Sequence, residues 1–244
     1  AHISAPEDIT TINYSLEWPY LENPSNTTFV GPTQIDICRC PKGNDSYQKS
    51  SDSEPGHIYT RYECTEPRVR FHSPEEGLWV LESVHGPINM LRPASHEEKE
   101  RRKEVHSEAD AAVYANRKLL FLSGPCPRGR YQSYATMQFL RSLSPSARAH
   151  ISCLSLLVQP YEEDCSEDYS KRAYAELAEY VLQNLPAFST LYLNIWDDET
   201  KLRAAASEFS ILLHKSDVKI AVGMNWWKGE MKEFNTARAF LEII

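Results

Sequence analysis

The sequence predicts an α/β protein with an open, curved and mostly parallel sheet of leucine-rich-repeat-like helix–strand units, plus a small antiparallel β element in the N-terminal half. Three observations predict it. Four short apolar segments are centred near residues 120, 155, 193 and 220. Amphipathic segments of helical length separate them. Short runs in the first half alternate apolar and polar residues, which is typical of half-buried strands.

The N-terminal part divides into two predicted regions. Residues 1–33 contain Pro6, Pro19, Pro24 and Pro32 among Ser, Thr and Asn, which predicts an irregular leader. Residues 34–93 form the predicted small antiparallel β element with one helix. Its expected strands are 35–40, 57–64 and 68–71, and its helix begins at Pro74 and runs through Val84, with acidic residues in its first turn.

Residues 94–244 form the predicted helix–strand repeat region, which we expect to be continuous with residues 34–93. Ser95 and Glu98 have the spacing of a capping box and predict a helix from there to about residue 115. The remaining elements are expected as strands at 119–122, 151–158, 191–195 and 218–222, and as helices at 133–143, 168–185, 199–213 and 234–243. Because strands that alternate with such helices need crossover connections, the four strands should be parallel.

The composition limits the possible partners and compartments. The net charge of −8 argues against nucleic acid as a main partner, since binding phosphates requires a basic face. No apolar run approaches the 18 or more residues that would span a membrane, and residues 1–8 contain no visible secretory signal. Six scattered cysteines do not indicate a disulfide scaffold. We therefore expect a cytoplasmic or nuclear protein, and three Asn-x-Ser/Thr sequons leave secretion open.

Two stretches resemble a known family. Residues 106–121 (HSEADAAVYANRKLLF) and the segment from Phe139 to Leu156, with Leu-Ser-Pro-Ser-Ala-Arg at 143–148, resemble ascomycete F-box-like proteins. The resemblance covers about residues 100–196 and implies a divergent α/β fold that recognises protein substrates. Members of that family usually open with a short helical box, and residues 1–33 contain none. A ubiquitin-ligase adaptor is therefore an expected partner only if box helices precede Ala1.

The loops after the four parallel strands are the predicted binding surface. Ligands of open parallel sheets bind outside the carboxyl ends of the strands, where these loops meet. The loops are rich in Arg, Tyr and Trp, which suits protein recognition. The nominated binding residues are Arg128, Arg130, Tyr131, Tyr161, Asp197, Asp198, Asn225, Trp226 and Trp227. In the alternative interpretation the aspartates cap a helix and the tryptophans cover the end of the core. Cys126 and Cys165 would lie on the same edge, where they could pair if the compartment were oxidising.

No recognisable catalytic, metal or cofactor motif accompanies these loops. The sequence has neither a Gly-x-Ser-x-Gly elbow nor a His-Glu-x-x-His pair. Residues 127–130 lack the glycine spacing of a phosphate-binding loop, and Cys38 and Cys40 are too close together for a usual zinc-ligand pair. The sequence therefore predicts no catalytic residue, no metal and no cofactor. The expected function is a non-enzymatic protein-recognition module; the alternative is a small-molecule-binding protein or an enzyme with a pocket at the same edge.

Overall fold

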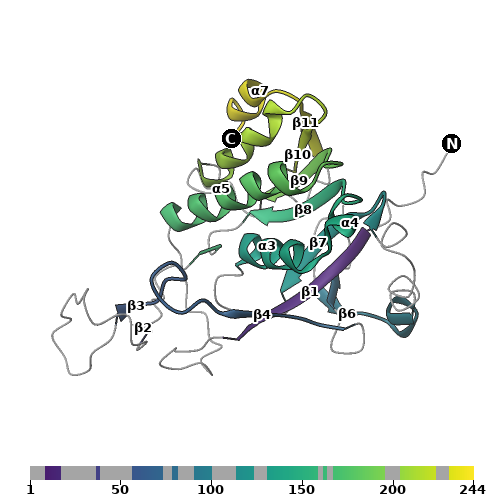
Figure 1. Cartoon of the computed structure of the whole chain (residues 1–244), viewed down its shortest axis with the longest axis vertical. Helices are drawn as coiled ribbons and strands as arrows, with labels where there is room; N and C mark the ends of the chain where they lie inside the picture. The colour runs from purple at the N-terminus through teal and green to yellow at the C-terminus, as the bar shows by residue number, and fades with distance from the viewer. Residues whose placement is uncertain are drawn as a thin grey trace.

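The computed structural model describes residues 9–17, 37–38, 57–73, 79–81, 91–100, 114–123, 131–158, 162–163, 167–195, 204–223 and 231–244. A seven-stranded sheet forms its centre, in the order β11–β10–β9–β8–β7–β1–β4 (Figure 1). The strand bounds are Ile9–Glu17 (β1), Arg68–Phe71 (β4), Lys118–Ser123 (β7), Cys153–Val158 (β8), Thr190–Ile195 (β9), Lys219–Gly223 (β10) and Met231–Phe234 (β11).

The five inner strands of this sheet run parallel. The strand β1 pairs with β7, β7 with β8, β8 with β9 and β9 with β10, all in parallel register. The sheet therefore grows in one direction along the chain, without a reversal of strand order. Antiparallel strands close the two ends, β4 beside β1 and β11 beside β10.

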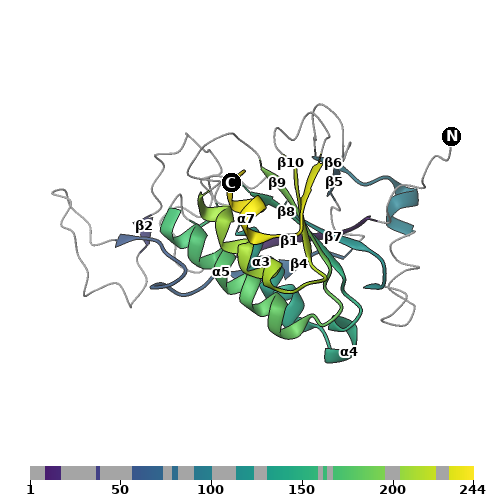
Figure 2. The ribbon, with the colours of Figure 1, turned by 90° about the horizontal axis from the view of Figure 1, so that it is seen from above.

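The helices that follow β7 in the chain lie together on one side of the sheet (Figure 2). They are α3 (Gln132–Ser142), the short α4 (Pro145–Arg148), α5 (Glu167–Asn184), the 3-10 helix η2 (Ser207–His214) and α7 (Ala237–Leu241). Successive members pack against each other, α3 on α5, α5 on η2 and η2 on α7. The helical segments between β7 and β10 thus cross the same face of the sheet.

The main hydrophobic core fills the space between the sheet and this helical layer. Alternate strand residues point into it, for example Leu154, Leu156 and Val158 of β8, all buried. From the helical side, the Phe139 ring of α3 makes an edge-to-face contact with Phe121 of β7, 5.5 Å between ring centroids. Such aromatic pairs stabilise a core beyond the area that they bury.

None of these five helices lies on the opposite face of the sheet; the helical turn at residues 96–100, which follows β6 (Leu91–Pro93) in the chain, lies away from them (Figure 2). Over the β1–β7 end of that face lies the hairpin of β5 (Trp79–Leu81) and β6, which contacts both strands (Figure 2). Towards β9, half-buried side chains such as Leu157, Tyr192 and Asn194 occupy this face. The side chain of Lys118 also lies there, with its ammonium 3.5 Å from the centre of the Tyr192 ring.

The predicted fold class is confirmed. The structure is α/β, its sheet is mostly parallel, and the four predicted strands lie side by side as β7 to β10. A small antiparallel pair, β2 (Ile37–Cys38) with β3 (His57–Ile58), occurs in the N-terminal half. The described start of the helix after Ser95 has the predicted capping box, because the Glu98 amide donates to Ser95 Oγ and the Ser95 amide donates to the Glu98 carboxylate.

The predicted irregular leader over residues 1–33 is wrong for residues 9–17, which form β1. This segment alternates β-branched or large apolar residues with polar ones, a pattern that favours a strand. The prolines at positions 6 and 19 bracket it and do not interrupt it. The prolines of residues 1–33 thus exclude a long helix but leave room for a strand between two of them.

Other predicted elements also need correction. The helix predicted from Pro74 through Val84 is wrong at its centre, where residues 79–81 form β5, because Trp and Val favour a pleated strand. The strand predicted at 57–64 ends at Ile58, and the amides of Glu63 and Cys64 then bond to the Thr60 carbonyl in a turn. The segment 68–71 joins the main sheet, and residues 231–234 form β11 before the short α7.

Candidate functional site

The first residues of α3 hold this helix at the carboxyl edge of the sheet through hydrogen bonds. Tyr131 precedes α3 in a left-handed conformation, with φ of 47°. The side chain of Gln132 then joins two strands: its amide group donates to the Phe121 carbonyl of β7, and its oxygen accepts from the Leu157 amide of β8, both at 2.5 Å. Gln132 therefore fixes α3 at the point where β7 and β8 end.

A carboxylate of the chain itself occupies the amino end of α3. The Ser133 amide donates to the side chain of Glu162, and the Tyr131 amide donates to the Glu162 carbonyl at 3.1 Å. Glu162 is fully buried. Because helix N-termini attract anions, this carboxylate takes the position that a bound phosphate or carboxylate ligand would need.

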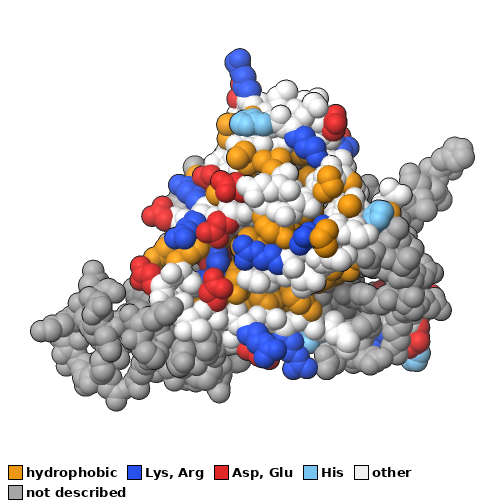
Figure 3. Space-filling view, viewed as in Figure 1, with side chains coloured by type: hydrophobic (Ala, Val, Ile, Leu, Met, Phe, Trp, Pro, Cys, Tyr) orange, Lys and Arg blue, Asp and Glu red, His pale blue; other side chains and the backbone are white. Residues whose placement is uncertain are grey.

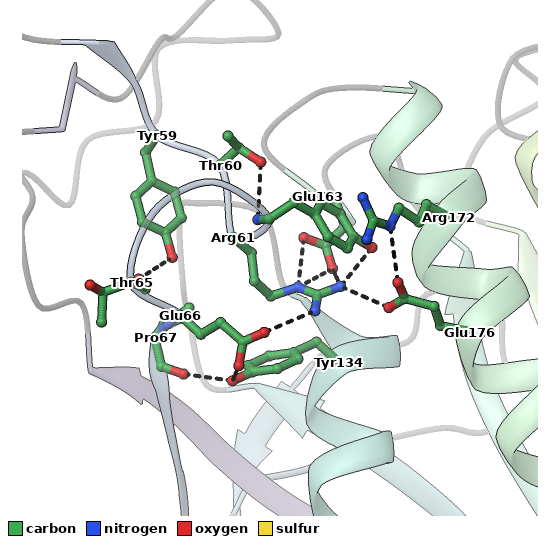
Figure 4. Close-up of polar contacts among 11 residues, drawn as sticks. Tyr59, Thr60, Arg61, Thr65, Glu66, Pro67, Tyr134, Glu163, Arg172 and Glu176 are labelled. Atoms are coloured by element: carbon green, nitrogen blue, oxygen red, sulfur yellow. Dashed lines mark hydrogen bonds and ion pairs between the residues drawn. The ribbon is translucent and has the colours of Figure 1, made fainter. Parts of the chain in front are cut away.

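Next to it, Arg61 forms the centre of a buried polar cluster (Figure 4). Its Nε donates to both oxygens of Glu163, at 2.9 and 3.2 Å, and its Nη2 lies 2.8 Å from Glu163 Oε1. The side chain of Arg61 is 3% exposed and that of Glu163 is 0% exposed. Glu66 and Glu176 lie farther from the guanidinium, each at 3.7 Å.

Aromatic rings enclose the same guanidinium. The carbon Cζ of Arg61 lies 4.3 Å from the ring centre of Tyr62 and 4.5 Å from that of Tyr134. On the Tyr62 ring lies a second guanidinium, that of Arg172, at 3.9 Å. Cations and rings therefore alternate from the surface inward, in the order Arg172, Tyr62, Arg61 and Tyr134. The cation–π attraction in such an arrangement grows as water is excluded.

The surroundings control the protonation of the cluster. Burial raises the pKa of Glu163 to about 8; Arg61 opposes the rise, and Glu162 and Glu176 add to it. Burial opposes the charge of Arg61, but Glu163 overrides this and raises the pKa of the guanidinium above its usual value. Burial raises the pKa of Tyr62 above its usual range, and burial with Glu66 raises that of Tyr134 to about 12. Both phenols therefore stay protonated in neutral solution.

This arrangement does not suit acid–base catalysis. A shifted carboxyl group in a cleft is a common mark of an active site. The contacts of Glu163, however, are to Arg61, and the side chain has no exposed surface with which to reach a substrate proton. Among the described residues, no three His, Cys, Asp or Glu side chains are grouped so that they could hold a metal ion.

The raised pKa of Glu163 predicts how stability depends on pH. A carboxyl group whose pKa rises from 4.5 to about 8 on folding contributes stability that is complete below pH 4.5 and is lost as the pH rises to about 8. Since the amide of Glu163→Gln does not titrate, wild-type protein should lose stability relative to this variant over that interval, by at most about 1.4 kcal/mol per pH unit. Urea unfolding of both proteins between about pH 5 and pH 8 measures this difference. A difference that is flat or grows with pH would contradict the prediction.

Of the nominated binding residues, the structure describes Tyr131. It lies at the carboxyl edge as predicted, but it is buried at the start of α3 and packs with Tyr59, Cys64 and Tyr134. The other nominated residues lie outside the described part of the chain: Arg128, Arg130, Tyr161, Asp197, Asp198, Asn225, Trp226 and Trp227. The same holds for Cys126 and Cys165.

Sequence reasoning missed the central residue of the cluster. The strand predicted at 57–64 gave Arg61 no role, whereas Arg61 lies in a turn and its side chain is buried. Glu163 belongs to the acidic stretch Glu162-Glu163-Asp164, and acidic stretches between strands and helices are usually solvated. Its partner lies 102 residues away, and no local pattern indicates a pair at that distance.

Comparisons with protein families, with curated proteins and with solved structures find no match for this chain. Within the described residues, no helix has the length and apolar character needed to cross a membrane. The resemblance to ascomycete F-box-like proteins stays a prediction, and the case for function depends on the geometry of the carboxyl edge.

Proposed function

We propose that this chain is a non-enzymatic protein-recognition module that presents the carboxyl edge of its parallel sheet to a protein partner. The observation that carries the proposal is the strand order. Open α/β sheets hold small ligands in the crevice where the strand order reverses. From β1 to β10 the order does not reverse, and the helices that follow β7 lie on one face (Figures 1 and 2). Among the described strands there is therefore no switch point of the kind on which the alternative function, a small-molecule or enzyme pocket, would depend.

The contents of the edge support the same proposal. Glu162 fills the anion position at α3, and Glu163 is turned inward to Arg61. What remains at the surface beside them is a rim of Tyr62, Tyr169 and Arg172. Tyr62 and Tyr169 are half-buried, with their ring centroids 5.3 Å apart, and the side chain of Arg172 is 58% exposed. Tyrosine and arginine provide much of the binding energy at protein interfaces, and a side chain already held in place loses less entropy on binding.

The charge on the helical side fits a protein partner with mixed charge. Acidic and basic side chains are interspersed there, and neither sign forms one large patch (Figure 3). The net charge of −8 also disfavours a polyanionic partner. The resemblance to F-box-like proteins is compatible with substrate recognition, and docking on a ubiquitin-ligase adaptor would further need box helices before Ala1.

The matched pair Arg172→Ala and Arg238→Ala tests the proposed rim. Both arginines bond through Nε to a glutamate one helical turn later, each at 3.0 Å, and both are exposed. Only Arg172 belongs to the rim. We expect Arg172→Ala to reduce recovery of a protein partner in affinity capture by about tenfold, the loss of a typical interface hot spot, and Arg238→Ala to leave it unchanged.

Equal recovery with both variants, in protein that unfolds at the wild-type urea concentration, would exclude the rim as the recognition surface. The double variant Trp226→Ala and Trp227→Ala extends the test to the nominated loop after β10. Unchanged recovery with that variant as well would remove the proposal for the whole carboxyl edge.

A further inference from the structure

The groups around Arg61 form a complete receptor for a guanidinium ion. Glu163 binds two of its nitrogens, and the Tyr62 hydroxyl accepts a bond from Nη2 at 2.7 Å. Glu66 and Glu176 provide further negative charge near Nη1 and Nη2. Two rings cover the flat faces. A site made of a carboxylate and aromatic rings selects arginine, whose guanidinium is a flat, forked donor. Lysine fits such a site less well, because its ammonium is a compact point charge.

The main part of the receptor and its present occupant belong to different parts of the chain, although Tyr62 and Glu66 lie on the same segment as Arg61. Glu163, Tyr134 and Glu176 come from the α/β body, on the loop before α5, on α3 and on α5 (Figure 4). Arg61 comes from residues 59–67, which we call the arginine segment. This segment runs across the carboxyl edge to β4.

The arginine segment has its own small hydrophobic anchor. Tyr59 and Cys64 pack with Tyr131 and Tyr134 in a small cluster of their own, which the half-buried Leu16 and Val69 join to the main core. Two further bonds return to the same place, because the Tyr134 hydroxyl contacts both Glu66 and the Pro67 carbonyl. A segment held by a satellite cluster opens locally at a lower free energy than the whole domain unfolds.

We propose that the pocket formed by Glu163, Tyr134 and Glu176 is a guanidinium-binding site that the arginine segment occupies as a tethered ligand, and that an arginine side chain of a protein partner competes for it. The identification of the competitor as a protein rests on the proposed function. The site itself does not. A tethered ligand has a high effective concentration, so a competitor in solution binds measurably only when the segment has opened or Arg61 has been removed.

The variant Arg61→Ala tests the site with methylguanidinium as the probe. A ligand that binds only the folded state raises the unfolding midpoint in a saturable way. We expect this for Arg61→Ala at concentrations of methylguanidinium below those that denature proteins, and not for methylammonium. Measured at about pH 9, above the pKa of about 8 of Glu163, the apparent affinity should be at least about tenfold lower in Arg61→Ala with Glu163→Gln, since the charge-assisted pair is lost. Equal responses to the two cations, or equal responses of the two variants, would overturn the proposal.

A second measurement on the unaltered chain keeps the proposal testable if Arg61→Ala does not fold. Hydrogen exchange of residues 59–67 should proceed through a local opening, at least about tenfold faster than that of β8 and α5. Exchange of the segment only by global unfolding would show that it is a fixed part of the core and no tethered ligand. Neither measurement involves Arg172. If both measurements contradict the guanidinium site but Arg172→Ala still reduces recovery of a protein partner, only the guanidinium site is excluded and the proposed function stands.

Discussion

Replacing Arg61 by methionine should lower the free energy of unfolding by about 3–5 kcal/mol, among the largest effects of any single substitution in this chain. Methionine retains most of the apolar stem but provides none of the bonds to Glu163. The carboxyl group would then remain buried without its partner, either ionised at high cost or protonated without its donors. Most of the lost free energy comes from the unpaired Glu163 carboxyl group. The loss therefore exceeds the net stabilisation that the Arg61–Glu163 pair itself provides.

Two companion variants test this account. Arg61→Lys keeps the positive charge but loses the bidentate fork and the flat stacking surface, so its loss should fall between wild type and Arg61→Met. The double variant Arg61→Met with Glu163→Leu removes both buried charges, and we expect it to be more stable than the sum of the single losses predicts. Urea unfolding with equal m-values measures all of these. A loss for Arg61→Met as small as that of the surface variant Arg172→Ala would refute the central role of the pair.

The repeating half of the fold was predictable because its information is local. Each of the strands β7 to β10 is a short apolar run, and the helices between them carry apolar residues at helical spacing. The direction of these strands follows from the length of the connections, because a crossover through a helix requires parallel neighbours. Pro145 after Ser144 and Pro186 after α5 also mark helix boundaries at the sequence level.

The N-terminal half was less predictable because its strands are placed by distant partners. The segment 9–17 lies between β7 and β4 only in the folded sheet, and Phe71 reaches the core through Phe139, far along the chain. The strand β5 pairs with a segment at 91–93 whose sequence contains a proline. Local pattern gives no information on such pairings.

The candidate site was predictable in place but not in content. The rule for parallel sheets led to the carboxyl edge, and the described polar cluster lies there. The rule does not say which loops fold over that edge, and the arginine segment, which supplies its central residue, comes from a part of the chain before the repeats. A buried arginine and its glutamate become recognisable only when the fold brings them within hydrogen-bonding distance.

The one-sided helical layer leads to the second large expected effect, on neighbouring leucines of β8. Leu156 is buried towards the helices, and Leu157 is half-buried on the opposite face. Leu156→Ala should lower the free energy of unfolding by about 3 kcal/mol, since it removes buried methyl groups and leaves a cavity between β8 and the helices. Leu157→Ala removes the same atoms from the same strand and should cost about 1 kcal/mol, because less apolar surface returns to water.

The comparison of these two leucines separates burial from strand propensity, which is the same for both substitutions. Urea unfolding of the two variants, with m-values equal to that of the wild type, gives the difference directly. If Leu157→Ala cost as much as Leu156→Ala, the helix-free face at β8 would be as tightly packed as the main core. In that case the helix-covered face would no longer hold the dominant core of the sheet. A partner would then have access to the carboxyl edge but not to the face that carries Leu157.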